Sequence, residues 1–375
     1  MSTSHKVYDF HRSIGHDIEF HHNALLVPWG INEPSGAKRA AGIFDAAGNY
    51  LTSAECLRTE ADPITIRPEF DADARVQDLN GRYLFGGLLY GHFGHFLCES
   101  TGRLWALDAI EGEIDGIVWF PKLPMGHAAK LTRPYKPFFN ALGHPELELV
   151  APQVVTRIRE LIIPAQGFGI GELSAGSPEF RQFMRRNLGG AVGPDGADKL
   201  YVSRSGLPVK RGSLLMEQRI EELLRLNGFE IFHPQDHPIE VQIARYKAAH
   251  LLVGLDGSAL HLAAMAVPAE CRVAIINRGP SQNIDDYLRQ FQHFAGISAT
   301  RIDAVTDYWF TAGRRVVKRE TQALADFPTL GAALVSGGFI SSATDWLNPE
   351  PGVVAAEVTA RELRCGVSLQ HYRVA

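Results

Sequence analysis

The sequence is poor in cysteine and has no long uninterrupted hydrophobic run. Its 375 residues include four cysteines, which are far apart and form no CxxC pair. This pattern argues against a zinc ribbon or a disulfide framework, so we expect reduced, buried thiols. No stretch approaches the roughly 20 apolar residues of a membrane-spanning helix, and the first residues lack the apolar segment of a signal peptide. We therefore expect a cytoplasmic protein, with peripheral association at the inner membrane face left open.

An excess of positive charge is also absent. The formal net charge is -5, which excludes a global positive field that would hold nucleic acid. The GxSxG, HExxH and P-loop patterns do not occur, so the chain lacks the signatures of serine hydrolases, zinc proteases and P-loop nucleotidases. What is present is an ordinary globular composition, with 45% hydrophobic and 21% charged residues. At about 100–200 residues per domain, the length predicts two domains.

The distribution of apolar runs and glycine divides the chain into segments. Residues 1–165 carry short apolar runs typical of strands, and a helix is predicted over 96–110, which together indicate an α/β domain. Residues 166–198 are rich in glycine and serine and are interpreted as a linker. Residues 199–300 alternate strands with helices, which predicts a doubly wound parallel sheet that binds ligands beyond the carboxyl ends of its strands. Residues 301–375 are less regular, and we expect an extension that packs back on the N-terminal domain.

A glycine turn follows the predicted strand that ends near residue 255. Asp256 is flanked by Gly254 and Gly257, and Ser258 opens the next predicted helix. Glycines there allow a ligand to approach the backbone, and a helix N-terminus presents free N–H groups, so the turn suits a diphosphate. Many strand-to-helix turns use glycine only to reverse direction, and that interpretation stays open.

A basic run without acidic residues lies at the start of the same region. Lys199, Arg204, Lys210 and Arg211 fall within thirteen residues, and Arg204 stands just past a predicted strand. Guanidinium groups match phosphate oxygens through two parallel hydrogen bonds. A solvated charged loop is the alternative. Because the basic run and the glycine turn meet at one edge of the predicted sheet, we favour an anion site.

The first domain contains a polar stripe of histidine and carboxylate. If the chain is helical from about residue 92, His92, His95, Glu99 and Arg103 share one helix face. A histidine with a carboxylate four residues on can be oriented and made more basic by it, as a general base requires. A helix surface without a role is one alternative. A metal site built on His92, His95 and Glu99 is another, although metal sites usually draw ligands from a second element.

These three segments, in the order in which they occur along the chain, resemble the family 61 glycosyltransferases, a group also described as capsular polysaccharide biosynthesis proteins. Residues 92–104 read H-F-G-H-F-L-C-E-S-T-G-R-L, similar to the family's N-Y-G-H-F-L-L-D-x-L-P-R-L. Residues 201–204 read Y-V-S-R, and Glu217 provides the acidic helix start that follows in the family. Residues 253–262, V-G-L-D-G-S-A-L-H-L, are similar to V-G-x-H-G-[AS]-x-L-x-N. The resemblance is strongest over residues 199–277.

The resemblance implies a GT-B fold of two Rossmann-like domains facing across a cleft, with the donor held mainly by the C-terminal domain. It also implies inverting, metal-independent transfer, without a separate cofactor, from a nucleotide-diphosphate sugar. We expect a UDP-linked donor and a glycan or lipid-linked glycan acceptor, in surface or capsular polysaccharide synthesis. One departure concerns Asp256, which stands where the family usually has histidine. Its charge would repel a diphosphate unless it is paired with Arg204 or Arg211.

The expected roles follow from these motifs. His95 is expected to be the base for the acceptor, with Glu99 orienting it, or the two roles are reversed. His92 and Arg103 are expected to support the acceptor side. The donor is expected to be held by Arg204, Lys210, Arg211, Asp256, Gly257 and Ser258. The alternative, favoured by Asp256, is a non-catalytic nucleotide-sugar-binding module or a partner in a polysaccharide assembly complex. An oligomer is left open.

Overall fold

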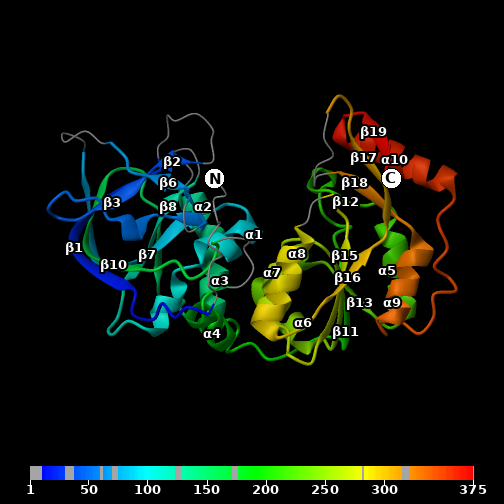
Figure 1. Cartoon of the computed structure of the whole chain (residues 1–375), viewed down its shortest axis with the longest axis horizontal. Coiled ribbons are helices and arrows are strands. Elements are labelled where there is room, and N and C mark those ends of the chain that lie inside the picture. The colour runs from blue at the N-terminus through cyan, green and yellow to red at the C-terminus, as the bar shows by residue number, and fades with distance from the viewer. Residues whose placement is uncertain are drawn as a thin grey trace, which may run out of the picture. The chain divides into compact units, whose positions relative to one another are not determined.

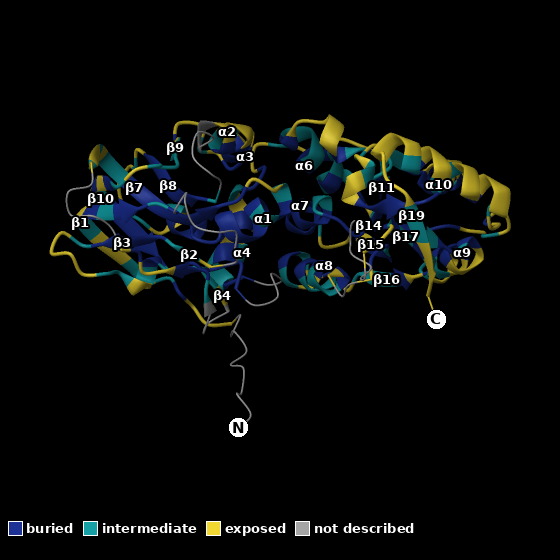
Figure 2. Cartoon of the chain, turned by 90° about the horizontal axis from the view of Figure 1, so that it is seen from above, coloured by how far each residue is buried: buried dark blue, intermediate teal, exposed yellow. Residues whose placement is uncertain are grey.

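The computed structural model divides into two compact units, Met1–Ala191 and Val192–Ala375 (Figure 1). The residues that the structure describes are 11–29, 38–59, 62–69, 75–122, 128–170, 176–280, 283–314 and 321–374. Buried positions concentrate along the strands of each unit (Figure 2). Each unit therefore has its own core, built where the sequence places its apolar runs.

The main sheet of unit 1 has the strand order β3-β1-β10-β7-β8-β9. The strands are β1 (Ile18–Val27), β3 (Gly42–Phe44), β7 (Gln77–Leu89), β8 (Gly116–Pro121), β9 (Glu148–Val150) and β10 (Thr156–Pro164). Strands β10, β7, β8 and β9 are parallel neighbours, whereas β1 and β3 run antiparallel. The α/β class is confirmed, but this sheet is mixed and not doubly wound throughout. Short apolar runs indicate strands without indicating their direction, which only pairing decides.

Small elements surround the main sheet of unit 1. Two short strand pairs flank it: β2 (Arg39–Ala40) with β6 (Thr65–Ile66), and β4 (Leu57–Thr59) with β5 (Asp62–Pro63). The helical elements are η1 (Thr52–Ala54), α1 (Phe93–His95), η2 (Phe96–Ser100), η3 (Leu104–Asp108), α2 (Ala128–Thr132), η4 (Arg133–Tyr135), α3 (Lys136–Ala141) and α4 (Pro178–Asn187).

The helix predicted over 96–110 is interrupted. A π-helical turn covers η2, and a 3-10 helix covers η3, with turns between them. The interruption falls at Gly102, where a Cβ atom would lie only 2.5 Å from the carbonyl oxygen of Phe168. The glycine lets the chain near Phe168 pack directly against this turn, and Gly167 N donates to Gly102 O at 2.7 Å. Tertiary packing therefore overrides a continuous helix here.

The sequence predicts a linker over 166–198, but most of the described part of this segment packs within unit 1. The Ser177 side chain caps α4 by accepting from Phe180 N at 3.2 Å. The rings of Phe168 and Phe180 stack with centroids 4.7 Å apart, and both residues are buried. The glycines serve close packing rather than free movement, so the boundary between the units falls later, after residue 191.

Unit 2 contains the parallel sheet expected from the sequence, with the order β13-β11-β14-β15-β16. Its strands are β11 (Lys199–Val202), β13 (Glu230–Phe232), β14 (Leu251–Leu255), β15 (Arg272–Asn277) and β16 (Thr300–Asp303). Its helical elements are α5 (Glu217–Leu226), η6 (Pro234–Asp236), α6 (Ile239–Ala248), α7 (Ala259–Ala266), α8 (Ile284–Gln290), η7 (Phe291–Ala295) and α9 (Phe327–Ser336). Helices α6, α7 and α8 lie on one side of the sheet, and α5 and α9 on the other (Figure 1). The doubly wound prediction is confirmed for this region.

The chain after residue 300 belongs to unit 2, which differs from the expectation that it packs on the N-terminal domain. Its strands are β17 (Val305–Thr311), β18 (Gln322–Ala325) and β19 (Leu369–Arg373), and its last helix is α10 (Pro351–Cys365). These strands form a second sheet with β12 (Ser213–Leu214), in the order β12-β18-β17-β19. Because β12 comes from the chain before α5, the extension is anchored within unit 2.

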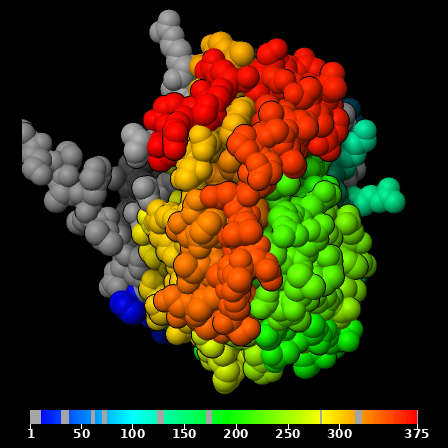
Figure 3. Space-filling view, turned by 90° about the vertical axis from the view of Figure 1, so that its right-hand side faces the viewer, coloured from blue at the N-terminus to red at the C-terminus, as the bar shows by residue number. Residues whose placement is uncertain are grey.

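The face of unit 2 that includes this extension is formed by segments far apart in the sequence. In Figure 3 the chain around α5, in green, lies beside the later segments in orange and red. The core explains this arrangement, because Leu223 and Leu224 of α5 share one hydrophobic cluster with Phe327 and Leu330 of α9. Burying these side chains together fixes α9 against the sheet.

Candidate active site

In unit 1, His95 and Glu99 form a pair at the start of the predicted polar stripe. Nδ1 of His95 contacts Oε1 of Glu99, and Nη2 of Arg58 donates to Oε2 of the same carboxylate at 3.0 Å. The Glu99 side chain is 4% exposed and that of His95 is 44% exposed. A buried carboxylate therefore holds an imidazole that remains open to solvent.

The charge state of Glu99 depends on these two partners. Burial alone would raise its pKa, but the hydrogen bond with His95 and the charge of Arg58 outweigh burial and lower the pKa below its usual value. Glu99 is therefore an ionised carboxylate at neutral pH. A carboxylate at Nδ1 favours the tautomer in which Nε2 carries the lone pair, and this is the nitrogen that can accept a proton.

Two aromatic contacts fix the plane of the His95 ring. It stacks on Tyr90 with centroids 5.2 Å apart at 20°, and the ring of His92 meets it edge-on at 5.4 Å. Nζ of Lys122 lies 4.2 Å from the centroid of the Tyr90 ring. Arg58, Tyr90 and Lys122 were missed by the sequence reasoning. Tyr90 is the last residue of the apolar run 82–90, which predicts a strand, but no sequence signal connects Arg58 or Lys122 to His95.

Arg103 does not continue the stripe, because the helix is interrupted before it. Its side chain is buried, and the guanidinium donates to the backbone oxygens of Pro164 and, at 2.8 Å, Glu55. It also lies over the ring of Phe85. Arg103 therefore joins the end of β10 to the chain before β4. It touches a small pocket that Glu99 also lines.

In unit 2, the carboxyl ends of β11 and β14 bring Arg204 and Gly257 together. A Cβ atom on Gly257 would lie 2.4 Å from Nη1 of Arg204, so only glycine leaves room for this guanidinium. Nη2 of Arg204 donates to the carbonyl oxygens of Arg211 and Gly212 at 3.3 and 3.4 Å. Burial and, to a smaller extent, the nearby charge of Arg278 lower the pKa of Arg204 to about 10, although the charge of Asp256 opposes them. Arg204 thus remains a cation at neutral pH.

Asp256 is fully buried, and its partner is one that the sequence reasoning missed. Nε of Arg278 lies 3.0 Å from Oδ1 of Asp256 and donates to the Asp256 carbonyl oxygen at 2.9 Å. The expected partners were Arg204 or Arg211. Arg278 follows β15 directly. Like Arg204, it therefore lies beyond the carboxyl end of a parallel strand, where ligands bind in such sheets. Because Arg278 is 3% exposed, its charge offsets that of Asp256 locally.

The remaining donor candidates lie in different surroundings. Ser258 precedes α7 as its N-terminal flanking residue and makes no side-chain capping bond. Lys210 and Arg211 are exposed on η5 (Val209–Arg211). Arg211 contacts Arg204 through its carbonyl oxygen, whereas Lys210 lines a separate pocket that also includes Trp309. Adjacent basic residues in sequence therefore do not form one cluster in space.

A buried carboxylate pair supports the backbone around Arg204. Oε1 of Glu217 accepts from Arg204 N at 2.7 Å and from the Ser203 hydroxyl at 3.1 Å. Oε1 of Glu221 accepts from the hydroxyls of Ser203 and Ser205 at 2.6 and 2.5 Å. The Tyr-Val-Ser-Arg motif therefore positions Arg204 through the first turns of α5. The sequence motif indicates Glu217 only as the acidic start of a helix.

Across the described ranges, no group of three or more His, Cys, Asp or Glu side chains is spaced to hold a metal ion, so the metal interpretation of His92, His95 and Glu99 gains no support. None of the helices in the described ranges is both long enough and apolar enough to cross a membrane.

The arrangement in unit 2, a parallel α/β sheet with an arginine against a glycine turn, is typical of proteins that bind phosphorylated ligands. The sequence model of the family Glycosyltransferase 61 matches residues 93–294. This match covers more than half of the chain and spans both His95 and Arg204, so the chain belongs to this family and is a glycosyltransferase. No curated protein matches the sequence.

Proposed function

We propose that the protein transfers a sugar from a nucleotide-diphosphate donor to a glycan acceptor, with inversion and without a metal ion. The observation that carries the proposal is the His95–Glu99 pair. A solvent-accessible imidazole is oriented by a buried, ionised carboxylate, within the segment that matches the family model. This is the arrangement that a general base for a hydroxyl group requires.

In the proposed reaction, the acceptor hydroxyl gives its proton to Nε2 of His95 as its oxygen attacks the anomeric carbon. The bond between that carbon and the diphosphate oxygen breaks in the same displacement, and the nucleoside diphosphate leaves with the electron pair. Glu99 stabilises the imidazolium that forms. The reversed assignment, with Glu99 as the base, requires the acceptor to reach a carboxylate whose side chain is 4% exposed, so we favour His95.

The proposal assigns the donor to unit 2. The Arg204 guanidinium against Gly257 and the N-terminus of α7 would bind the diphosphate and stabilise the charge that develops on it. The buried Asp256–Arg278 pair supports this assignment, because the positive charge of Arg278 offsets the negative charge of Asp256. The GT-B organisation, a UDP-linked donor, a cytoplasmic location and a role in surface polysaccharide synthesis are further parts of the proposal.

Substitution of the pair tests the base. We expect His95→Ala and Glu99→Gln each to lower kcat by about 10²–10⁴-fold with little change in the KM for the donor, as for loss of a general base. The rates of nucleoside diphosphate release and of acceptor glycosylation are measured together.

The matched control for this test is His144→Ala. His144 also pairs with a glutamate in unit 1, but that glutamate, Glu146, is 64% exposed rather than buried, and the variant should keep the full rate. Near-native transfer by both His95→Ala and Glu99→Gln would rule out the assignment. Nucleotide binding without release of product in the unmodified protein would instead support a non-catalytic binding module.

A further inference from the structure

A second pocket lies in unit 2 beside the small sheet formed by the C-terminal extension. It has a volume of about 290 Å³ and is lined by residues of η5, β17, β18 and the end of α10. Arg204 and Gly257 do not line it. Trp309, Thr321 and Cys365 lie beyond residue 294, where the match to the family model ends. The pocket is therefore largely a feature of the segment outside the matched region.

We propose that this pocket binds a single sugar residue that carries an anionic group, either a carboxylate or a phosphate, as a site separate from the donor site. The choice of a carbohydrate rests on the proposed glycosyl transfer. The anionic group, the size and the hydrogen bond follow from the residues that line the pocket.

The first observation is an unsatisfied hydroxyl in the wall. Thr321 is 4% exposed, and its Oγ1 atom has no hydrogen-bond partner within the described ranges. A buried polar group without a partner costs about 1–3 kcal/mol, so such groups usually have one, and a ligand can supply it. Because Thr321 lines the pocket, a sugar hydroxyl or an anionic oxygen placed there would satisfy it.

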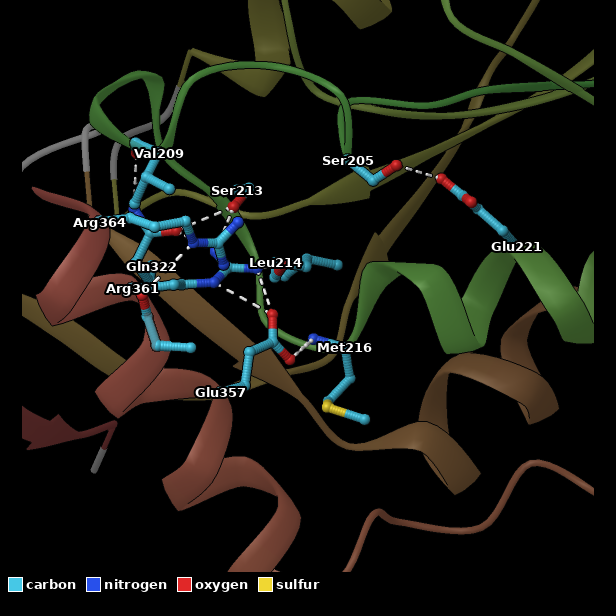
Figure 4. A network of polar contacts seen from close by, with 11 residues as sticks. Ser205, Val209, Ser213, Leu214, Met216, Glu221, Gln322, Glu357, Arg361 and Arg364 are labelled. Carbon is cyan, nitrogen blue, oxygen red and sulfur yellow. Dashed lines mark hydrogen bonds and ion pairs between the residues drawn. The ribbon is translucent and has the colours of Figure 1, made fainter.

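The next residue, Gln322, does not offer a ligand an unsatisfied group as Thr321 does. Gln322 also lines the pocket, but its Oε1 accepts from the Ser213 hydroxyl at 2.8 Å and from Arg361, and its Nε2 donates to Val209 O at 2.8 Å. Figure 4 shows Gln322 inside this network, between η5 and α10. Gln322 is thus held by the protein, whereas Thr321 is left for a ligand.

The charged side chains in the described lining of the pocket are both positive. Lys210 and Arg314 both line the pocket, and no Asp or Glu is among the lining residues that the structure describes. In the described part of the chain, neither Lys210 nor Arg314 forms an ion pair. Two cations at one pocket favour a ligand with a carboxylate or phosphate.

An aromatic ring supplies the apolar surface. Trp309 lines the pocket and packs against His371, with ring centroids 4.7 Å apart. His371 is itself held by Asp307, with Nε2 and Oδ1 2.6 Å apart. The indole therefore has a fixed position, and a fixed indole offers a flat surface to the C–H face of a sugar ring.

The volume limits the size of the ligand. Pockets for drug-sized ligands span about 300–1,000 Å³, so a pocket of 290 Å³ suits one sugar ring with its substituent better than a whole nucleotide sugar. This size separates the proposed ligand from the intact donor.

Cys365 provides a direct test, because it lines the pocket and is exposed, whereas the other three cysteines are buried. Alkylation of Cys365 by iodoacetamide is followed by mass spectrometry in the full chain. We expect glucuronate or glucose 6-phosphate to slow alkylation severalfold, and glucose at the same concentration to protect much less. Whichever of the two anionic sugars protects better identifies the anionic group.

Variants connect the protection to the pocket. In Thr321→Val, and in the double variant Lys210→Gln with Arg314→Gln, we expect the concentration for half-maximal protection to rise by roughly tenfold or more. Thr321→Val conserves volume and removes an unsatisfied hydroxyl, so its melting temperature should be unchanged or higher, which shows that it folds. Arg364→Gln is the matched control, because Arg364 is exposed on α10 and does not line the pocket.

Three results would overturn the inference: no protection by either anionic sugar, equal protection by inorganic phosphate or UMP, or unchanged protection in both variants. The assay needs no turnover, so it gives the same answer in His95→Ala. If the anionic sugars protect Cys365 but the chain transfers no sugar, the pocket is supported and the proposed reaction is not. If the chain transfers sugar but Cys365 is not protected, the reaction is supported and the pocket is not.

Discussion

Two buried glutamates show how local partners decide the charge of a residue. Glu99 and Glu217 are both largely removed from solvent, at 7% and 2% exposure. Burial raises the pKa of each, but the contacts of Glu99 with His95 and Arg58 more than reverse the effect. For Glu217 burial dominates and raises the pKa to about 7, although Arg204 N and the Ser203 hydroxyl donate to it. The ionised Glu99 can therefore orient the His95 imidazole, whereas Glu217 positions the backbone at Arg204.

The raised pKa of Glu217 predicts how stability changes with pH. The pKa of Glu217 in the folded protein, about 7, exceeds the ordinary value of 4.5. The contribution of Glu217 to the free energy of unfolding is therefore fully present below pH 4.5 and is lost as pH rises through 7. We expect Glu217→Gln, which resembles the protonated form, to reduce this loss by up to about 3 kcal/mol. The free energy of unfolding in urea at pH 5 and pH 8 measures it.

The control for this measurement is Glu222→Gln, on the same helix but exposed and paired with Arg219. It should leave the difference between pH 5 and pH 8 as it is in the unmodified chain. An equal pH dependence in Glu217→Gln and the unmodified chain would contradict the raised pKa.

At the scale of elements, α10 shows how a C-terminal helix can stabilise a distant turn. The guanidinium of Arg361 donates to Leu214 O at 3.1 Å and to the Ser213 hydroxyl at 2.6 Å, and it also contacts Glu357 (Figure 4). Glu357 in turn accepts from Met216 N at 2.8 Å. Met216 has φ 60, a left-handed conformation that costs a non-glycine residue about 1–2 kcal/mol. Helix α10 therefore holds the entry to α5 in place.

Arg361→Ala should destabilise the protein by about 2–4 kcal/mol, because Gln322 and Leu214 O lose a buried hydrogen-bond donor and Glu357 loses its cationic partner. Thermal unfolding followed by circular dichroism should show the melting temperature fall by at least several degrees. Arg364→Ala is the matched control, since Arg364 lies on the same helix and bonds only to Ala360 O among the contacts described. Equal melting temperatures for the two variants would show that α10 does not anchor β12.

For the whole molecule, the residues proposed for the base and for the donor belong to different units. His95 and Glu99 lie in unit 1, and Arg204, Gly257 and Arg278 lie in unit 2. Each unit has its own sheet and core. Binding and chemistry should therefore be separable by substitution in the full chain.

Calorimetric titration with UDP, GDP and CMP tests this division. We expect one of these nucleotides to bind, with roughly tenfold or greater loss of affinity in Arg204→Ala, because a charged hydrogen bond contributes about 1.5–3 kcal/mol. His95→Ala should bind that nucleotide as the unmodified chain does. Arg225→Ala, which removes an exposed arginine of α5, is the control.

The opposite pattern, with binding lost in His95→Ala and kept in Arg204→Ala, would refute the proposed division. Absence of binding by all three nucleotides would contradict the assignment of a donor site to Arg204 and Gly257.

The sequence alone predicted the parallel sheet of unit 2, because strand and helix periodicities alternate cleanly over 199–300 and parallel strands require such crossovers. It also placed Arg204 and Gly257 at one edge, since the carboxyl ends of parallel strands lie together. The short spacing between His95 and Glu99 was enough to pair them even though the helix is not regular. Local patterns therefore identified the features that depend on neighbours in sequence.

Only the tertiary structure decided the contacts between distant segments. Arg278 pairs with Asp256, and Arg58 donates a hydrogen bond to Glu99. Lys210 lines a pocket together with Trp309, and Arg204 does not line that pocket. The extension after residue 300 completes a sheet with β12 in unit 2. Periodicity states which face of an element is apolar but not which other element will cover it. That choice depends on the summed burial and hydrogen bonding of residues far apart in the sequence, such as Arg361 and Ser213, which are 148 positions apart.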